Sequence, residues 1–246
     1  MYVKLIANTP EPERVVGMAC RECYSPLPPE KLAEQLSAHE CKEIIRRVRN
    51  MGHTSTFEHA SFTFAISGVS RTLSHQLVRH RIASYSQRSQ RYVDENGIEV
   101  VVPPNIVNVD KANDIFCRFV AESHRVYKKL AMLGISKEDA RFVLPGGACT
   151  DIVVTMNARA LLNFFKERTC ARAQWEIRYM ATLMLEQVLR VAPIMFEKAG
   201  ASCVSCKTCT QSKLSCGDFK HDTNDLVVKN KATYGGFHSI VTGGKK

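Results

Sequence analysis

The sequence predicts a mixed α/β (α+β) fold in which helices dominate and strands are few. Several segments place apolar residues three and four positions apart, the spacing of one helix face, and the longest of them covers 110–133. Shorter segments alternate apolar and polar residues, as a strand with one buried face does. The sequence contains no internal repeat, and no break before residue 200 suggests two independent domains. We therefore expect one domain over 1–200 and a cysteine-rich C-terminal extension over 201–246.

The first sixty residues predict one strand and two helices. YVKLIAN (2–8) reads as a short strand, and the prolines after it begin a helix that continues to about residue 19. A second helix is expected over 38–50, with Gly52 at its C-terminal end. The polar segment HTSTFEH (53–59) predicts a turn. Four residues at helical spacing form the apolar face of the second helix: Cys41, Ile44, Ile45 and Val48.

The middle of the chain predicts two strands, a helix and a loop. SFTFAI (61–66) has the period-two pattern of a half-buried strand. Ser70 is a suitable N-cap for a helix over 71–81. SYSQRSQR (84–91) shows neither period, so we expect a loop there, and EVVVP (99–103) predicts a strand.

Helices prevail in the second half of the chain. The expected elements are a long helix over 110–133, a short helix over 136–145, a strand over 149–156, a helix from the Asn157 cap to 168, and a last helix over 172–196. The final thirty residues have weak periodicity, and no element is predicted for them.

Net charge and composition limit the partners and the cellular location that we expect for this protein. The chain has 34 basic and 24 acidic residues, a surplus of +10 that suits nucleic acid, an anionic surface or phosphorylated small molecules. No apolar stretch is long enough for a membrane helix, and the first residues lack the pattern of a secretory signal. We expect a cytoplasmic protein that binds no membrane, whose ten cysteines do not form a disulfide scaffold.

The densest chemical signal is RHRIASYSQRSQR (79–91). Its arginines stand among serines and glutamines, and a planar guanidinium can bind two phosphate oxygens at once. A helix that ends in such a loop makes a good anion cradle. The same residues could equally be a solvated basic loop, and residue chemistry alone leaves both interpretations open.

The spacing within this segment resembles a known signature. Arg79-His80-Arg81, followed after seven residues by Ser89, is similar to the RHR-x7-S motif of flavin-dependent thymidylate synthases. Further segments resemble that family in the same order along the chain: HTSTFEHASFTF (53–64), Ala140-Arg141 with Val143-Leu144-Pro145, Asn157-Ala158-Arg159 with Asn163-Phe164, and AQWEIR (173–178). The resemblance covers about residues 40–197, so chance matches do not explain it.

The resemblance implies the family's own fold, a helix-rich subunit around a mixed or antiparallel sheet that assembles into a homotetramer with active sites between subunits. It implies reductive methylation of dUMP to dTMP, with methylene-tetrahydrofolate as carbon donor and FAD, reduced by NADPH or NADH, as hydride carrier. Residues 1–200 would then be the catalytic domain.

The family's binding residues map onto this sequence one by one. FAD contacts are expected at His53, Ser55, Arg79, His80, Arg81, Gln87, Asn157, Arg159 and Asn163. Contacts to dUMP are expected at Gln76, Arg79, Gln87, Arg88, Ser89, Gln90, Arg91, Arg141 and Arg168. The catalytic residue is Arg168, because the family arginine at this place contacts the pyrimidine and favours ionisation at N3. A cation there stabilises the electron-rich ring that must attack through C5.

Two positions depart from the family pattern. Gln87 stands where many members have glutamate; it keeps hydrogen bonding to an amide edge but cannot act as a carboxylate base. Arg172 stands where histidine is frequent, and it could still contact FAD.

Four cysteines gather near the C-terminus, beyond the family motifs. The spacing Cys203-x2-Cys206-x2-Cys209-x6-Cys216 could hold tetrahedral zinc, or an iron–sulfur cluster less readily. The alternative is a reduced, flexible tail, and the resemblance assigns the cysteines no role.

Two other functions compete with the enzyme. A basic nucleic-acid-binding protein with a zinc-knuckle tail would explain the charge and the cysteines, but not the ordered motifs, and the arginine loop lacks interleaved aromatic residues. A family relative that binds FAD and nucleotide but has changed its reaction would explain Gln87. We therefore expect no nucleic-acid partner.

Overall fold

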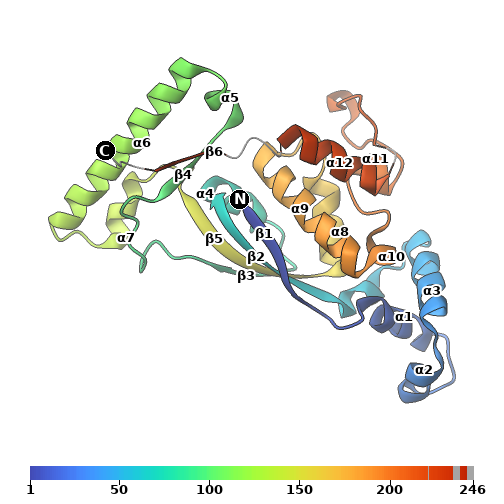
Figure 1. The fold of residues 1–246 in the computed structure, drawn as a ribbon. Coiled ribbons are helices and arrows are strands. Elements are labelled where there is room, and N and C mark those ends of the chain that lie inside the picture. Colours follow the sequence, from blue (N-terminus) through green and yellow to red (C-terminus); the bar gives the residue numbers. More distant parts are fainter. Residues whose placement is uncertain (221, 235–238, 243–246) are drawn as a thin grey trace.

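The structure is a computed structural model that describes residues 1–220, 222–234 and 239–242. Its centre is an open four-stranded antiparallel sheet in the order β1-β2-β5-β3 (Figure 1). The strands are β1 (Tyr2–Asn8), β2 (Ser61–Ser70), β3 (Ser84–Gln87) and β5 (Cys149–Asn157). A separate antiparallel pair consists of β4 (Glu99–Val102) and β6 (Ser239–Thr242). The expected helix-rich fold with few strands is confirmed.

The two central strands bury one face each. Phe64 of β2 lies opposite Val154 of β5, and Ile66 lies opposite Ile152; all four side chains are buried. The intervening residues face the other side of the sheet, where the hydroxyls of Thr63 and Thr155 lie 3.0 Å apart. Period-two alternation thus directs the apolar residues to one face.

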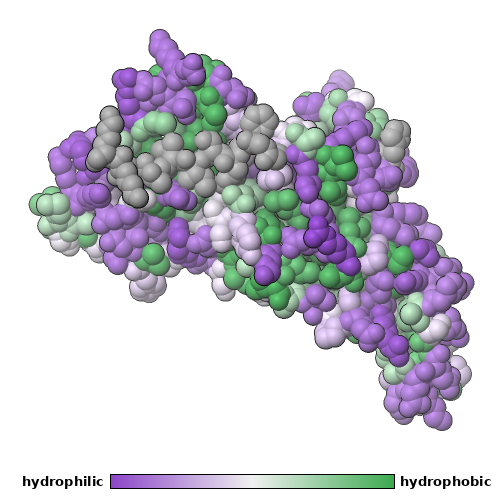
Figure 2. Space-filling view, viewed as in Figure 1, coloured by the Kyte–Doolittle hydropathy of each residue, from purple (hydrophilic) through white to green (hydrophobic). Residues whose placement is uncertain are grey.

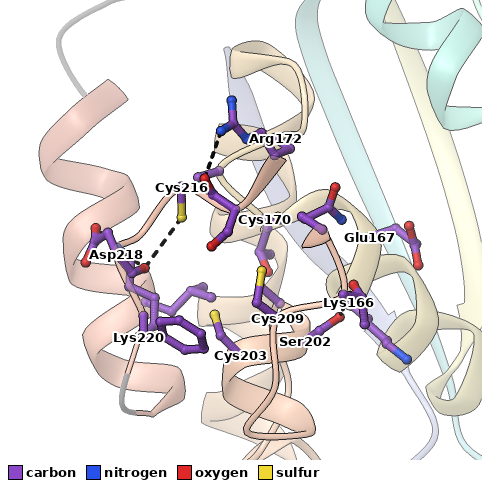
Figure 3. Close-up of a pocket in the computed structure, with 18 of the residues that line it drawn as sticks. Lys166, Glu167, Cys170, Arg172, Ser202, Cys203, Cys209, Cys216, Asp218 and Lys220 are labelled. Atoms are coloured by element: carbon purple, nitrogen blue, oxygen red, sulfur yellow. Dashed lines mark hydrogen bonds and ion pairs between the residues drawn. The ribbon is translucent and has the colours of Figure 1, made fainter. Parts of the chain in front are cut away.

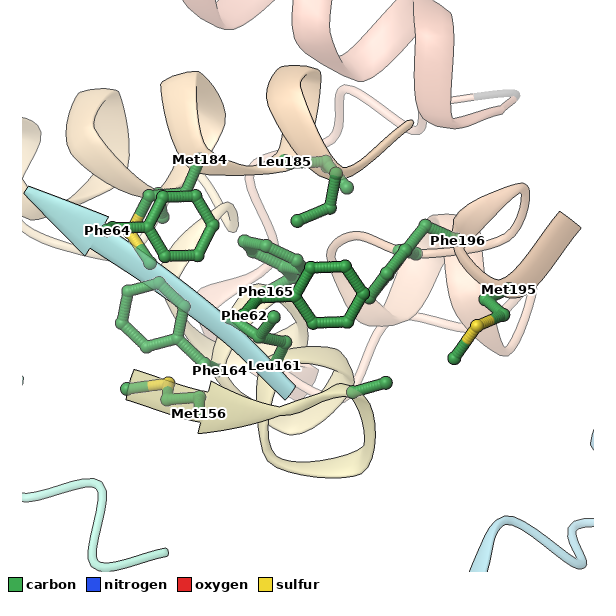
Figure 4. Packing of buried hydrophobic residues seen from close by; sticks show 14 of the residues in the cluster. Phe62, Phe64, Met156, Leu161, Phe164, Phe165, Met184, Leu185, Met195 and Phe196 are labelled. Carbon is green, nitrogen blue, oxygen red and sulfur yellow. The ribbon is translucent and has the colours of Figure 1, made fainter. Parts of the chain in front are cut away.

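Helices of the C-terminal half cover this apolar face. They are α8 (Ala158–Arg168), α9 (Trp175–Val191), α10 (Pro193–Phe196) and α12 (Thr223–Tyr234), with the short α11 (Ser202–Ser205) beside them (Figure 1). Figure 4 shows the aromatic side chains that join helices and sheet. The Phe196 ring meets Phe62 of β2 edge-on at 5.5 Å between centroids and Phe165 of α8 at 6.0 Å.

The remaining helices, apart from α4, lie toward the two ends of the molecule (Figure 1). At one end, α1 (Pro12–Glu22), α2 (Pro29–Gln35) and α3 (Ala38–Asn50) pack together, and a capping box between Ser37 and Glu40 begins α3. At the other end, α5 (Pro104–Val107), α6 (Asp110–Met132) and α7 (Lys137–Ala140) lie beside β4. Helix α4 (Arg71–Leu77) follows β2 directly.

Several predicted elements differ in the structure. The helix expected over 136–145 is α7, which ends at Ala140. The expected loop 84–91 begins with β3, a four-residue edge strand whose polar residues gave no period-two signal. The expected helix 71–81 ends at Leu77, and the Tyr85 hydroxyl lies within 2.9 Å of the carbonyl oxygen of that residue. The expected helix 172–196 begins at Trp175 and is interrupted before Pro193, which has no N–H to continue it.

The C-terminal extension is more regular than the sequence indicated. Leu226 and Val227 of α12 join the same buried cluster as α8 and α9. Helices α2, α5, α11 and α12 have no predicted counterpart.

Hydrophilic residues cover most of the coloured face seen in Figure 2. Figure 2 shows hydrophobic residues gathered around the middle of the visible face, near β1 and α9. Tyr2 and Ile6 of the edge strand β1 are each about half exposed, at 53% and 51%. Across the residues that the structure describes, no helix is both long enough and apolar enough to cross a membrane.

Candidate active site

The RHR segment is positioned by α4 and by the helix cap that begins it. The Ser70 side chain accepts a hydrogen bond from the Leu73 amide, which fixes the first turn of α4. Ser70 is itself held by the buried Glu176 of α9, whose carboxylate accepts from the Ser70 amide at 2.8 Å and from its hydroxyl at 2.5 Å. The AQWEIR motif therefore anchors the element that leads into the RHR segment.

His80 is the member of the triplet that turns inward. Arg79 and Arg81 are exposed, whereas the His80 ring packs edge-on against Phe164 at 4.9 Å between centroids. The Nε of Arg168 donates a hydrogen bond to Nε2 of His80 at 2.9 Å. Burial, reinforced by the Arg168 charge, lowers the pKa of His80 to about 4. The imidazole is therefore neutral near pH 7, with its accepting nitrogen committed to Arg168.

Gln87 is held by two hydroxyls. Its side-chain amide donates to Ser74 Oγ at 3.0 Å and to Thr150 Oγ1 at 3.2 Å. Ser74 commits its own proton to the carbonyl of Arg71 at 2.9 Å, so its oxygen is left to accept. These contacts suit an amide better than the carboxylate that is frequent at this position.

Arg88 has protein partners on several sides. Its guanidinium donates to the Asp151 carboxylate at 2.8 Å and to the Cys149 carbonyl at 3.0 Å. Its Nε lies 3.9 Å from the buried carboxylate of Glu95. Desolvation raises the pKa of Glu95, while the charge of Arg88 opposes that rise. Arg88 therefore braces the loop against β5, and its expected contact with dUMP stays a prediction.

The arginines at 91 and 141 both contact Glu138 of α7. Arg91 pairs with the Glu138 carboxylate at 2.9 Å, and Arg141 donates to the Glu138 carbonyl at 3.0 Å. The charge of Arg141 also contributes, after burial, to a lowered pKa for Arg71. Arg141 thus lies near Arg91 and within reach of the charge of Arg71, and this concentration of cations suits a phosphate. Of the neighbouring loop residues, Ser89 accepts from the Arg91 amide and Gln90 is buried.

The expected flavin residues of the third motif lie along α8. Asn157 caps the helix through the Ala160 amide at 2.8 Å, and the exposed Arg159 pairs with Glu58 at 2.6 Å. Arg159 and Asn163 line an open groove, here called the α8 groove. Four cationic side chains reach it: Arg49, Arg159, Lys166 and Lys198.

The first motif lies next to the α8 groove. Thr54 lines the groove, and its neighbours His53 and Ser55 are exposed. The cationic lining fits a group that carries a diphosphate, as FAD does. Of the residues expected to hold FAD, Arg159 and Asn163 therefore lie on a surface whose charge fits that cofactor, and His53 and Ser55 lie exposed beside it.

These features form two groups within one chain. One group is the cluster of Arg91, Arg141 and Glu138, and the other is the lining of the α8 groove. Among the described residues, no hydrogen bond or ion pair joins the two. His80 and Arg168 connect the RHR segment with the end of α8. Gln76, on α4, is partly buried.

Of the two alternatives for the four C-terminal cysteines, zinc binding is not supported by the structure. Cys203, Cys209 and Cys216 line a pocket between α8 and the extension (Figure 3), whereas Cys206 lines the α8 groove. Cys206 follows the end of α11, and this turn carries it away from the other three. In the described part of the chain, no three His, Cys, Asp or Glu side chains are grouped as a metal site requires.

Several residues of the site carried no signal in the sequence. Glu138 and Glu58 pair with the expected ligands Arg91 and Arg159 across 47 and 101 positions of chain. Glu138 belongs to no motif, and the motif that contains Glu58 does not name its partner, so only the fold reveals these pairs. Arg172, considered as a flavin contact, donates to the carbonyls of Leu214 and Ser215, and its contact with FAD stays a prediction.

Comparison with known proteins identifies the family. A family model described as thymidylate synthase complementing protein matches residues 4–194, well over half of the chain. The chain belongs to this family. The assignment agrees with the resemblance drawn from the RHR-x7-S motif.

Curated relatives in the thymidylate synthase complementing family match most of the chain. A protein from Clostridium tetani named flavin-dependent thymidylate synthase is 45% identical over 231 residues, covering 87% of this chain and 92% of its own length. A protein of the same name from Geobacter sulfurreducens is 46% identical, covering 88% and 94%. A third, from Nitratidesulfovibrio vulgaris, is 43% identical, covering 88% and 94%.

Proposed function

We propose that this protein is a flavin-dependent thymidylate synthase, an enzyme of de novo dTMP synthesis that reductively methylates dUMP. Methylene-tetrahydrofolate supplies the carbon, and NADPH is the reductant. The observation that carries the proposal is the contact between Arg168 and His80, because it joins the expected catalytic arginine to the RHR motif. The family membership of the chain and the names of its relatives support the same proposal.

FAD would be held along the α8 groove. Arg159 and Asn163 lie on the groove itself, and Asn157, His53 and Ser55 lie beside it. Arg79, His80 and Arg81 would contact the cofactor from the RHR segment. When bound and reduced, FAD supplies the hydride that the reaction needs.

The nucleotide would be bound by its phosphate first. Arg91 and Arg141 both contact Glu138, Arg91 at its carboxylate and Arg141 at its backbone carbonyl. A phosphate dianion there can replace the carboxylate as the partner of Arg91 and add a partner for Arg141. Gln76, Arg79 and the loop from Gln87 would orient the rest of the nucleotide.

Arg168 would act on the pyrimidine. A neutral His80 leaves the arginine's charge uncompensated on that side, because imidazole only accepts a hydrogen bond. A guanidinium at N3 and its neighbouring carbonyl favours the anionic ring and so makes C5 a better nucleophile.

The working enzyme would be a cytoplasmic homotetramer with a catalytic domain over 1–200 and an extension over 201–246. The separation of the two groups of expected ligands within one chain supports active sites made by two subunits. The half-exposed Tyr2 and Ile6 on an edge strand support a contact between subunits.

The test is release of tritium from 5-tritiated dUMP by protein loaded with FAD, given NADPH and methylene-tetrahydrofolate. Arg168→Ala is expected to lower the rate at least 100-fold, as loss of an electrostatic stabiliser does. Arg190→Ala removes an exposed arginine of α9 whose partner is Glu186 and serves as the matched control, with unchanged release.

Two outcomes would overturn the proposal in different ways. A yellow protein that binds dUMP but releases no tritium would indicate a relative with changed chemistry. A protein that binds neither flavin nor dUMP would restore the nucleic-acid-binding interpretation.

A further inference from the structure

The end of α8 needs support from outside the helix. Arg168 is the last residue of α8, and Thr169 is its C-cap. The last carbonyls of a helix have no partner within it. Thr169 is 2% exposed, so water cannot readily satisfy its carbonyl, and an unpaired buried carbonyl is costly.

A residue of the C-terminal extension supplies the missing partner. Asn230 of α12, 6% exposed, donates from Nδ2 to the Thr169 carbonyl at 3.1 Å. The same nitrogen donates to Thr182 Oγ1 of α9 at 3.2 Å. Thr182 gives its own proton to the carbonyl of Arg178, so it is free to accept. Both hydrogens of the Asn230 amide are therefore donated, one to the end of α8 and one to α9.

A second contact holds the next turn of chain. The guanidinium of Arg172 donates to the carbonyls of Leu214 and Ser215, at 3.1 Å for Ser215. Figure 3 shows Arg172 above Cys216, with a dashed line from its guanidinium to the adjoining chain of the extension. The segment from Thr169 to Arg172 is thus held at both ends by the extension.

We infer that Asn230 is a positioning residue, through which the C-terminal extension fixes Arg168 for its contact with the pyrimidine. The Arg168 backbone is held by the Asn230 contact on its C-terminal side, and its guanidinium is held by His80. Misplacement of a catalytic group by about 1 Å costs on the order of 100-fold in rate, so such a support matters. The inference rests on the proposed function, because it assumes that Arg168 contacts dUMP.

The first experiment measures dUMP affinity without turnover, by calorimetry on the FAD-loaded protein. Asn230→Ala leaves the Thr169 carbonyl unpaired and is expected to weaken dUMP binding about 10-fold. Arg172→Ala, at an exposed position that spares the core, is expected to weaken it about threefold.

Lys231→Ala is the matched control for α12. It removes the neighbouring ion pair between Lys231 and Glu186 at 2.9 Å and leaves Thr169 untouched. Unchanged dUMP affinity is expected. An equal loss in this control would overturn the inference, because general docking of α12 would then be what matters.

A double-mutant cycle separates positioning from simple stability. In an Arg168→Ala background, Asn230→Ala is expected to cause no further loss of dUMP affinity, because the group that it positions is gone. A full additive loss would show that Asn230 acts elsewhere and would overturn the inference.

The same cycle distinguishes the two levels of the proposal. If Arg168→Ala alone changes neither dUMP affinity nor tritium release, the proposed role of Arg168 fails. If Arg168→Ala weakens dUMP binding but Asn230→Ala and Arg172→Ala leave dUMP affinity unchanged, only the positioning role fails.

Discussion

Arg168 donates a hydrogen bond to a histidine that burial keeps neutral: its Nε lies 2.9 Å from Nε2 of His80. The two residues are 88 positions apart in sequence, one at the end of α8 and one in the RHR motif. The neutral imidazole accepts a hydrogen bond from Arg168 but carries no charge of its own. The positive charge of the guanidinium is therefore left for a ligand. The burial of this histidine should make the stability of the protein depend on pH.

Stability should fall in mild acid because of His80. The pKa of His80 is about 4 in the fold, below the ordinary 6.5, so the unfolded chain binds the proton more readily between these values. The fold therefore keeps its full free energy of unfolding above pH 6.5, as far as His80 is concerned. It loses the contribution of the neutral His80 as pH falls from 6.5 toward 4. Urea unfolding of the ligand-free protein at pH 4.5, 5.5, 6.5 and 7.5 measures this slope.

His80→Gln provides the comparison for the pH experiment. Glutamine can still accept from Arg168 but does not titrate, so its unfolding free energy should depend less on pH over the same window. An identical slope in variant and wild type would show that other groups cause the acid sensitivity.

Replacement of Gln87 by glutamate should destabilise this particular chain. Ser74 gives its proton to the Arg71 carbonyl, so a carboxylate would face the lone pairs of Ser74 where the amide now donates. We expect Gln87→Glu to lower the free energy of unfolding by about 1–2 kcal/mol at pH 7. Gln35→Glu, at an exposed position of α2, introduces the same charge and should change stability by less than about 0.5 kcal/mol. Equal stability of the two variants would contradict the assigned hydrogen-bond directions.

Local patterns predicted the core and the caps of this fold well. The alternation of Phe62, Phe64 and Ile66 predicted a strand with one buried face, and β2 has it. Asn157 was predicted to cap α8, and its side chain does so. Both features depend on residues close together in the chain, so periodicity and capping rules describe them fully.

Elements stabilised by distant contacts escaped prediction. Helix α12 has no clear apolar stripe: Leu226 and Val227 are buried, while Val228 beside them is 66% exposed. It is held by packing on α9 and by single contacts such as that of Asn230. The family resemblance supplied the expected site residues, but Glu138 and Asn230 lie outside its motifs.

Glu176 should be important for stability although it lies away from the expected ligands. Its carboxylate is 1% exposed and accepts from the amide and the hydroxyl of Ser70. Glu176→Ala would leave both donors buried without a partner, so we expect the free energy of unfolding to fall by about 3 kcal/mol. Urea unfolding measures the change, and Ser70→Ala in the same background should then cost less than it does alone. Strictly additive losses would show that the two residues act separately.

Glu138 should compete with the nucleotide phosphate for Arg91. The ion pair lies at the surface, with about half of each side chain exposed, so it contributes at most about 1 kcal/mol. Glu138→Gln removes the competing charge and keeps the backbone carbonyl that holds Arg141. We therefore expect dUMP to bind about two- to fivefold more tightly at low salt, with a smaller gain at high salt. Glu34→Gln, an exposed change on α2, controls for net charge; tighter binding in both variants would mean that overall charge, and not release of Arg91, is responsible.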